Sequence, residues 1–203
     1  MNEAQNMNPI RTQVKFFFRN PAAVDVAAFA ALFQRWIQKQ TLEGLLIDVA
    51  DYRHVFEGPG VMLIGHDSDY SIENRHGRLG LLYTLKRQTD ADLPTRLRTS
   101  LRLALTACQQ IEWETSFIPP LKFRTSELEI RFADRLNFPN RPGVFARVEE
   151  DITAAVGDLY GEHSFSVEPV IHDPRYLFTV AAYGEDEVDI TGLLQNLKAP
   201  IEK

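Results

Sequence analysis

Two apolar stripes at helical spacing constrain the fold of this chain most strongly. The first stripe consists of Phe29, Leu32, Phe33 and Trp36, and the second consists of Ile152, Ala155, Val156 and Leu159. Apolar residues at positions i, i+3, i+4 and i+7 predict amphipathic helices that each cover one face of a sheet. Each stripe follows one strand-like segment and precedes at least two more, so the chain reads as two successive β-α-β-β units.

The surrounding segments complete the two units. The first is predicted as strand, helix, three strands and helix over 11–19, 24–40, 44–55, 61–72, 79–86 and 92–111, with Asp90 or Asp92 as the cap of its second helix. The second is predicted as strand, helix, two strands and helix over 121–132, 145–159, 164–171, 176–183 and 189–197. The predicted fold class is therefore α+β, with two consecutive ferredoxin-like β-α-β-β units, the first with an extra strand, forming antiparallel sheet covered by helices.

This pattern also predicts the domain organisation. Residues 1–10 form a disordered tail, 11–116 the first unit and 117–203 the second, and we expect both units to pack as one compact domain because each sheet face needs cover. Asp51-Tyr52-Arg53 and Asp173-Pro174-Arg175 both lie near the end of the strand after the helix. These matched positions favour an internal repeat, although two amphipathic patterns also align by chance.

Composition limits the partners. The 203 residues carry a net charge of −6, whereas binding to nucleic acid or to an anionic membrane surface relies on basic surface. The chain contains no apolar run of the ~20 residues that a membrane span needs. The single cysteine, Cys108, shares a helical stripe with Leu101 and Leu105, so we interpret it as a core residue. A lone cysteine suits a reducing compartment, and we expect a cytoplasmic protein with no nucleic-acid or membrane partner.

Several motif-like segments lack an essential part of the motif. A strand, not a helix, is expected after Gly58-Pro59-Gly60, so this segment is a turn and not a phosphate loop. The series from Asp67 to Glu73 has Ile72 where a calcium loop needs glycine. The histidines lack the helical spacing of a zinc protease. We therefore predict no metal and no cofactor.

Two segments have alternative interpretations. Lys15-Phe16-Phe17-Phe18 resembles the stacking strand of an RNA-binding sheet, but the acidic balance favours core phenylalanines. Arg96, Arg98 and Arg102 form a basic cluster with Lys86 and Arg87. We interpret this cluster as the solvated side of a helix, and contact with an anion or a partner is the alternative.

The densest run of polar side chains lies between Asp48 and Arg78. Asp48 interrupts an apolar string and is expected to be half-buried, which requires a partner. A turn that places Tyr52 opposite Ile64 would bring Asp48 and His66 to one face of the sheet, where they form a polar seam or a site. A slip of one residue would reverse this assignment. The other polar side chains of the run are predicted to bind a ligand: Asp51, Arg53, His54, Asp67, Asp69 and Arg78.

Two functions remain open at this stage. We expect a non-catalytic binding or assembly module for a protein partner or a small polar ligand, because no signature of a reaction is present. The alternative is a small-molecule enzyme in which His66 acts in general acid–base chemistry with Asp48 or Asp67. The sequence does not decide between an enzyme and a binding protein, and it is compatible with a homodimer.

Overall fold

A single antiparallel sheet of eight strands runs through the computed structural model, which describes residues 9–87, 90–170 and 173–198. The strands are β1 (Thr12–Phe18), β2 (Leu46–Tyr52), β3 (Gly60–Gly65), β4 (Ser68–Glu73), β5 (Gly80–Leu85), β6 (Phe123–Phe132), β7 (Phe165–Pro169) and β8 (Phe178–Gly184). The helices are α1 (Ala28–Lys39), α2 (Leu93–Glu112), α3 (Glu149–Tyr160) and α4 (Ile190–Lys198), with the short 3-10 turns η1 (Pro21–Ala23), η2 (Arg75–Gly77) and η3 (Phe145–Arg147). The predicted α+β class with antiparallel sheet is confirmed.

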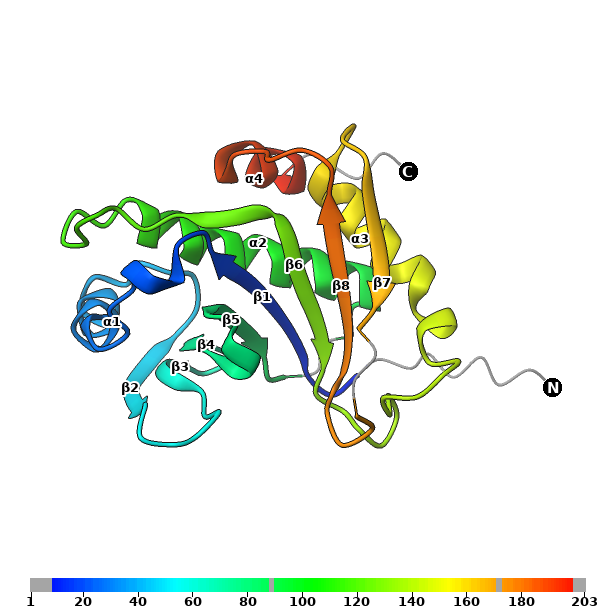
Figure 1. Cartoon of the computed structure of the whole chain (residues 1–203), viewed down its shortest axis with the longest axis horizontal. Coiled ribbons are helices and arrows are strands. Elements are labelled where there is room, and N and C mark those ends of the chain that lie inside the picture. The colour runs from blue at the N-terminus through cyan, green and yellow to red at the C-terminus, as the bar shows by residue number, and fades with distance from the viewer. Residues whose placement is uncertain (1–8, 88–89, 171–172, 199–203) are drawn as a thin grey trace.

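The strand order is β2-β3-β4-β5-β1-β6-β8-β7 (Figure 1). The first strands of the two predicted units, β1 and β6, pair antiparallel inside this sheet. From β1 the chain passes through α1 to the edge strand β2, and β3, β4 and β5 fill the space between. From β6 it passes through α3 to the other edge strand, β7, and β8 fills the space between. Because neighbouring strands are antiparallel throughout, each first strand is parallel to the strand after its helix.

The first unit contains one strand more than the sequence predicted. The segment 61–72 was expected as one strand, but it forms β3 and β4 around a tight turn at His66 and Asp67. The Lys86 ammonium donates to the Gly65 carbonyl at 2.6 Å, which ties this turn to the chain after β5. Periodicity did not reveal the turn because an apolar half and a polar half also describe a strand that runs out of the core.

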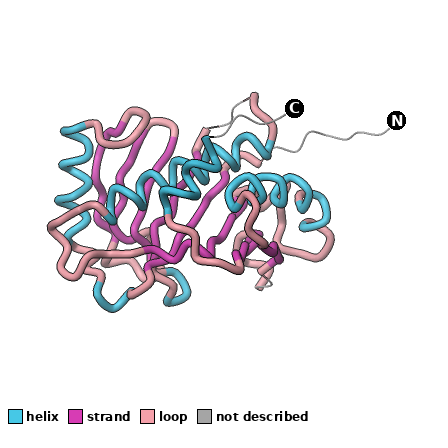
Figure 2. The backbone as a smooth tube through the Cα atoms, turned by 90° about the horizontal axis from the view of Figure 1, so that it is seen from above, coloured by secondary structure: helices cyan, strands magenta, loops and turns pink. Residues whose placement is uncertain are grey.

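The helices cover one face of the sheet. α1 packs on β2 and β3, α2 packs on β1 and β5, and α3 packs on β7. Seen from above, α2 crosses the strands (Figure 2). Alternate residues of β6, namely Leu128, Ile130 and Phe132, enter the core beneath the helices. Cys108 is also fully buried in this core, as expected.

The helix ends follow local signals. The Asp92 carboxylate accepts a hydrogen bond from the Thr95 N–H at 3.0 Å, so Asp92 is the predicted cap of α2. The helix predicted over 24–40 is shorter, because 24–27 form a turn after η1 and α1 begins at Ala28. In the described part of the chain, no helix is both long and apolar enough to cross a membrane.

Candidate functional site

The face of the sheet opposite the helices carries a buried set of charges. Because side chains alternate along a strand, the residues between the core positions of β1, β4 and β6 point to this second face. The set comprises Lys15 on β1, Glu73 on β4, Glu127, Glu129 and Arg131 on β6, and Arg78 after η2. We call these six residues the ionic cluster.

Two carboxylates connect the cluster. Glu73 accepts from the Lys15 ammonium at 2.6 Å and from the Arg131 guanidinium at 3.1 Å. Glu129 accepts from Arg131 at 2.7 Å and from Arg78 at 2.7 Å. Arg78 also pairs with Glu127. Three cations and three carboxylates thus balance each other in formal charge.

Burial sets the protonation chemistry of the cluster. The Lys15 side chain is fully shielded from solvent and the Glu73 side chain is 3% exposed. Burial lowers the pKa of Lys15 from 10.5 to about 8, against the opposing effect of Glu73. Burial alone would raise the pKa of Glu73, but Lys15 and Arg131 outweigh it and the pKa falls below its ordinary value.

Phe17 also lies on this face, beneath the cations. The Arg78 guanidinium lies 3.8 Å from the centre of the Phe17 ring, and the Lys15 ammonium lies 5.2 Å from it. Phe17 is 3% exposed, and Phe16 and Phe18 are also buried. The interpretation of these phenylalanines as core is confirmed.

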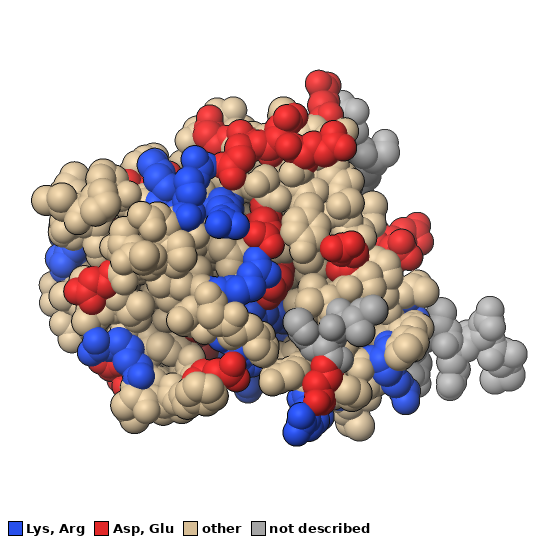
Figure 3. All heavy atoms as spheres, viewed as in Figure 1, with Lys and Arg blue, Asp and Glu red and all other residues tan. Residues whose placement is uncertain are grey.

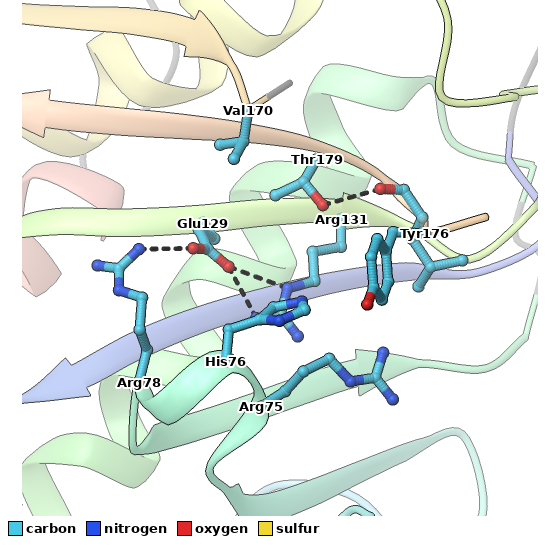
Figure 4. Close-up of a pocket in the computed structure, with 9 residues that line it drawn as sticks. Arg75, His76, Arg78, Glu129, Arg131, Val170, Tyr176 and Thr179 are labelled. Carbon is cyan, nitrogen blue, oxygen red and sulfur yellow. Dashed lines mark hydrogen bonds and ion pairs between the residues drawn. The ribbon is translucent and has the colours of Figure 1, made fainter. Parts of the chain in front are cut away.

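A cavity of about 110 Å³ opens over the cluster (Figure 4). The floor is formed by Glu129, Arg131 and Thr179, from β6 and β8. The walls come from η2 and from the connection between β7 and β8, which supply Arg75, His76, Arg78, Val170, Tyr176 and Leu177. Segments far apart in the sequence therefore build this cavity.

Arg75 distinguishes this cavity from a purely structural ion network. The backbone N–H of Arg75 donates to the second oxygen of Glu73 at 2.7 Å, which fixes η2 over the cluster. The Arg75 guanidinium forms no hydrogen bond or ion pair with the described residues, and it lies beside Tyr176 in Figure 4. Since the cluster is balanced internally, Arg75 gives the cavity a surplus positive charge.

His76 separates this cavity from a second one. Its backbone is left-handed, with φ of 58°, and its ring meets the Tyr176 ring edge-on at 5.0 Å. The second cavity, of about 660 Å³, lies on the other side of His76 and includes Arg53 and Phe56 in its lining. Figure 3 shows this face hollowed at its centre, where basic and acidic side chains lie next to each other.

The predicted register between β2 and β3, on which the shared site of Asp48 and His66 rested, is wrong. Tyr52 lies opposite Gly60, not Ile64, and Asp48 lies opposite Ile64 after an irregularity in β2. Asp48 is exposed, and its carboxylate accepts from the neighbouring Val49 N–H at 2.7 Å. His66 lies in the β3–β4 turn, 46% exposed, where its ring is 3.8 Å from Asp67. No hydrogen bond or ion pair joins Asp48 to His66 in the described structure.

The predicted ligand-binding residues fall into two groups at opposite ends of β3 and β4. Asp67 and Asp69 lie at the β3–β4 turn, where they pair with Arg87 and Lys86. The other four lie toward the cavities: Asp51, Arg53, His54 and Arg78. Arg53 pairs with Asp51 at 2.7 Å and also lines the second cavity, while Arg78 lines the first.

The sequence analysis did not select Arg75, His76 or Tyr176, although Arg75 and His76 lie within the run from Asp48 to Arg78. One available signal was the alternation along β6, where Glu127, Glu129 and Arg131 occupy every second position. Charges at that spacing in a central strand indicate a polar face that other residues must satisfy. No signal in the sequence indicated that the β7–β8 connection would lie against η2.

The basic cluster on α2 also differs from its expected arrangement. Arg98 and Arg102 form ion pairs with Asp158 and Glu43, but Arg96 is only 2% exposed. The interpretation as a solvated helix side is therefore wrong for Arg96, because this position faces the sheet.

No protein-family model matches the chain, and no curated protein matches it.

Proposed function

We propose that this protein is a non-catalytic binding module for a small organic carboxylate, held in the cavity between η2 and the β7–β8 connection. The observation that carries the proposal is the guanidinium of Arg75, which lines the cavity with no partner among the described residues while the charges beneath it are balanced. A guanidinium presents parallel N–H donors that match two carboxylate oxygens.

The rest of the lining suits the carbon skeleton of such a ligand. Val170, Leu177 and the Tyr176 ring supply apolar surface beside Arg75. The cavity volume of about 110 Å³ limits the buried part of the ligand to a few heavy atoms. The buried cluster holds η2 in place through Glu73, so the site is largely pre-formed, as ligand sites usually are.

Isothermal titration calorimetry with acetate, propionate and benzoate tests this proposal. We expect saturable binding of at least one of these carboxylates to the full chain, and a loss of affinity of tenfold or more in Arg75→Gln. Arg87→Gln is the matched control, because Arg87 is an exposed arginine at the β3–β4 turn and pairs with Asp67. Equal affinity in wild type and Arg75→Gln, or no saturable binding of any of the three, would overturn the proposal.

The acid–base enzyme alternative gains no support from these contacts. It requires His66 to be oriented by Asp48 or Asp67, and only Asp67 lies near the ring, at 3.8 Å on an exposed turn. A general base needs a partner that fixes its orientation and a pocket that holds the substrate. The cavity over the ionic cluster is lined by His76 instead.

We also propose that the sheet contains two ferredoxin-like units related by an internal repeat. In both halves a helix connects two parallel strands with an antiparallel strand set between them. Supporting this, the turns after β2 and β7 hold the same ion pair: Arg53 Nε donates to Asp51 at 2.9 Å, and Arg175 Nε donates to Asp173 at 2.9 Å. The additional strands of the first half would then be an insertion.

A homodimer is the second proposal for partners. The edge strand β2 and the loops on either side of it expose several large apolar side chains, with Leu45 64%, Ile47 54% and Phe56 93% exposed. An unpaired edge strand can pair with the same strand of a second copy. Sedimentation velocity of wild type and Phe56→Ser tests for this dimer, and a monomer at all concentrations would exclude the dimer.

A cytoplasmic location likewise stays our proposal, supported by the single buried cysteine, Cys108.

A further inference from the structure

The turn η2 lines two cavities at once. The first cavity, which opens over the ionic cluster, takes Arg75 and Arg78 from η2 and the residue after it. The second cavity takes Asn74 and Gly77 from the same segment. His76 belongs to the lining of both cavities. The two cavities are therefore neighbours that meet at the His76 side chain.

The His76 ring contacts a wall of each cavity. Its Nδ1 lies 3.7 Å from the Glu57 carboxylate, which belongs to the second cavity. The ring also meets Tyr176, a wall of the first cavity, edge-on at 5.0 Å (Figure 4). The His76 side chain is 34% exposed, so part of it faces solvent between the two cavities. A molecule held in the first cavity can therefore extend over the solvent side of His76 into the second.

The first cavity alone limits how tightly a ligand can bind. Its volume of about 110 Å³ admits a carboxylate group and a few further heavy atoms. The binding free energy of a small ligand is limited by its number of heavy atoms. A ligand confined to this cavity, such as acetate, therefore binds weakly even when its contact with Arg75 is ideal. Higher affinity requires further apolar surface next to the first cavity.

The second cavity supplies such a surface. Its volume of about 660 Å³ lies in the range of known small-molecule sites. Its apolar lining comes from the segment before α1, the end of β2, the loop 53–59, β4 and the residue before β5, and comprises Val26, Tyr52, Val55, Phe56, Ile72 and Leu79. The loop exposes two of these side chains, with Val55 45% and Phe56 93% exposed. Exposed apolar side chains gathered at a cavity indicate a site for an apolar group.

The charges that line the second cavity disfavour a second anionic group. Arg53 is compensated, because it donates to the two oxygens of Asp51 at 2.9 and 2.7 Å. Glu57 places a carboxylate beside His76. Among the described residues of this lining, no surplus positive charge remains for an anion. A carboxylate here would lose hydration and meet the like charge of Glu57, so the second cavity favours an uncharged tail.

We infer that the two cavities together bind a monocarboxylate with an apolar tail, of the medium-chain alkanoate class. The inference rests on the proposed function, because Arg75 holds the carboxylate group in the first cavity. The tail passes over His76 and lies against Val55 and Phe56 in the second cavity. Glu57 selects against molecules that carry a second carboxylate at the end of the tail.

A series of chain lengths tests the path of the tail. Acetate, butyrate, hexanoate and octanoate are titrated calorimetrically into the full chain. Each methylene that leaves water should raise the affinity about fourfold, so octanoate should bind at least about a hundredfold more tightly than acetate. Equal affinities along the series, all lowered in Arg75→Gln, would overturn this inference and leave the carboxylate site standing. No saturable binding of any alkanoate would overturn both.

Variants of the loop 53–59 test the second cavity. Phe56→Ser should lower the affinity for octanoate about tenfold and leave that for acetate unchanged, because only the long tail reaches the loop. Leu136→Ser is the matched control, since Leu136 is 88% exposed but lines neither cavity. Because Phe56 also enters the proposed dimer, Val55→Thr is the second variant, and it should weaken octanoate severalfold. Unchanged affinity for octanoate in both loop variants would overturn the inference.

Suberate, which has the length of octanoate and a carboxylate at each end, tests the selection by charge. We expect suberate to bind about tenfold more weakly than octanoate, and Glu57→Gln to narrow this difference. Equal affinities of the two in wild type would overturn the assignment of an uncharged tail to the second cavity. Arg75→Gln should weaken octanoate about tenfold or more. Octanoate binding that is unaffected by Arg75→Gln would show that the second cavity binds apolar molecules by itself, and would overturn the inference.

Discussion

The Lys15 ammonium donates to Glu73 at 2.6 Å, and both side chains are almost entirely shielded from solvent. This pair joins β1 to β4 across β5, on the face of the sheet that carries no helix. Arg131 shares the same Glu73 oxygen at 3.1 Å. The pair therefore anchors the ionic cluster on which η2 and the cavity rest.

Removal of one member of this pair should be strongly destabilising. Lys15→Met leaves the Glu73 carboxylate buried with only Arg131 as a charged partner, and breaking a buried pair from one side typically costs about 3–5 kcal/mol. We expect that loss in the free energy of unfolding, measured by urea denaturation. The control is Arg102→Gln, which breaks a partly exposed pair with Glu43 and should cost less than about 1 kcal/mol. A similar, small effect of both variants would contradict the burial of the cluster.

The lowered pKa of Lys15 predicts how stability depends on pH. In the folded protein Lys15 releases its proton near pH 8, while in the unfolded chain it keeps the proton until about pH 10.5. Between these values the unfolded chain binds more protons, so this group makes the free energy of unfolding rise with pH. The contribution approaches about 3 kcal/mol by pH 10.5 if the shift is fully expressed. Urea denaturation from pH 7 to pH 10 measures it.

The comparison with Lys15→Met isolates this effect, because other groups titrate in the same range in both proteins. We expect the stability of wild type to rise with pH relative to that of the variant. If the two curves run parallel, Lys15 does not change its protonation state near pH 8 in the folded protein.

Periodicity predicted the helix side of the sheet well and the opposite side poorly. Leu128, Ile130 and Phe132 share the buried face of β6, as apolar residues at period two in a strand do. The same period places Glu129 and Arg131 together, but it does not tell whether that second face is solvated or covered. The cover comes from contacts between η2 and the β7–β8 connection, which depend on tertiary packing.

The predicted register between β2 and β3 was wrong, because it depended on where the connecting loop begins and ends. The prediction assumed a turn at 57–60 with Tyr52 opposite Ile64, but the loop covers 53–59, so Tyr52 pairs with Gly60 and Asp48 lies opposite Ile64. This difference of four residues is even and leaves the faces unchanged, but β3 ends at Gly65, so His66 lies in the β3–β4 turn and not on a strand. The order of the elements in the second unit depended only on apolar spacing, and the structure confirmed it.

Gly60 allows β3 to start directly against β4. Its φ is 67°, and a Cβ at this position would lie 1.9 Å from the Ile72 carbonyl oxygen. Gly60→Ala should therefore destabilise the protein by more than about 3 kcal/mol, because both the left-handed backbone and the contact oppose a side chain. Gly44→Ala is the matched control, since Gly44 has φ of 97° and no atom within 4 Å of its Cβ position. The control should cost about 1 kcal/mol in the same denaturation experiment, and equal losses would show that the contact with Ile72 is relieved at no cost.

His76 and His66 provide a direct comparison of the observed cavity with the site predicted from sequence. His76 lines the carboxylate cavity and contacts the Tyr176 ring at 5.0 Å, while His66 lies on the exposed β3–β4 turn. His76→Asn keeps a residue that tolerates the left-handed backbone but removes the ring, so Tyr176 loses its neighbour and the wall of the cavity loosens. We expect the affinity for the carboxylate that binds wild type to fall about fivefold or more, which corresponds to about 1 kcal/mol. His66→Ala should leave that affinity unchanged in the same calorimetric titration. The opposite result, with loss in His66→Ala and none in His76→Asn, would move the site back to the β3–β4 turn and favour the acid–base alternative.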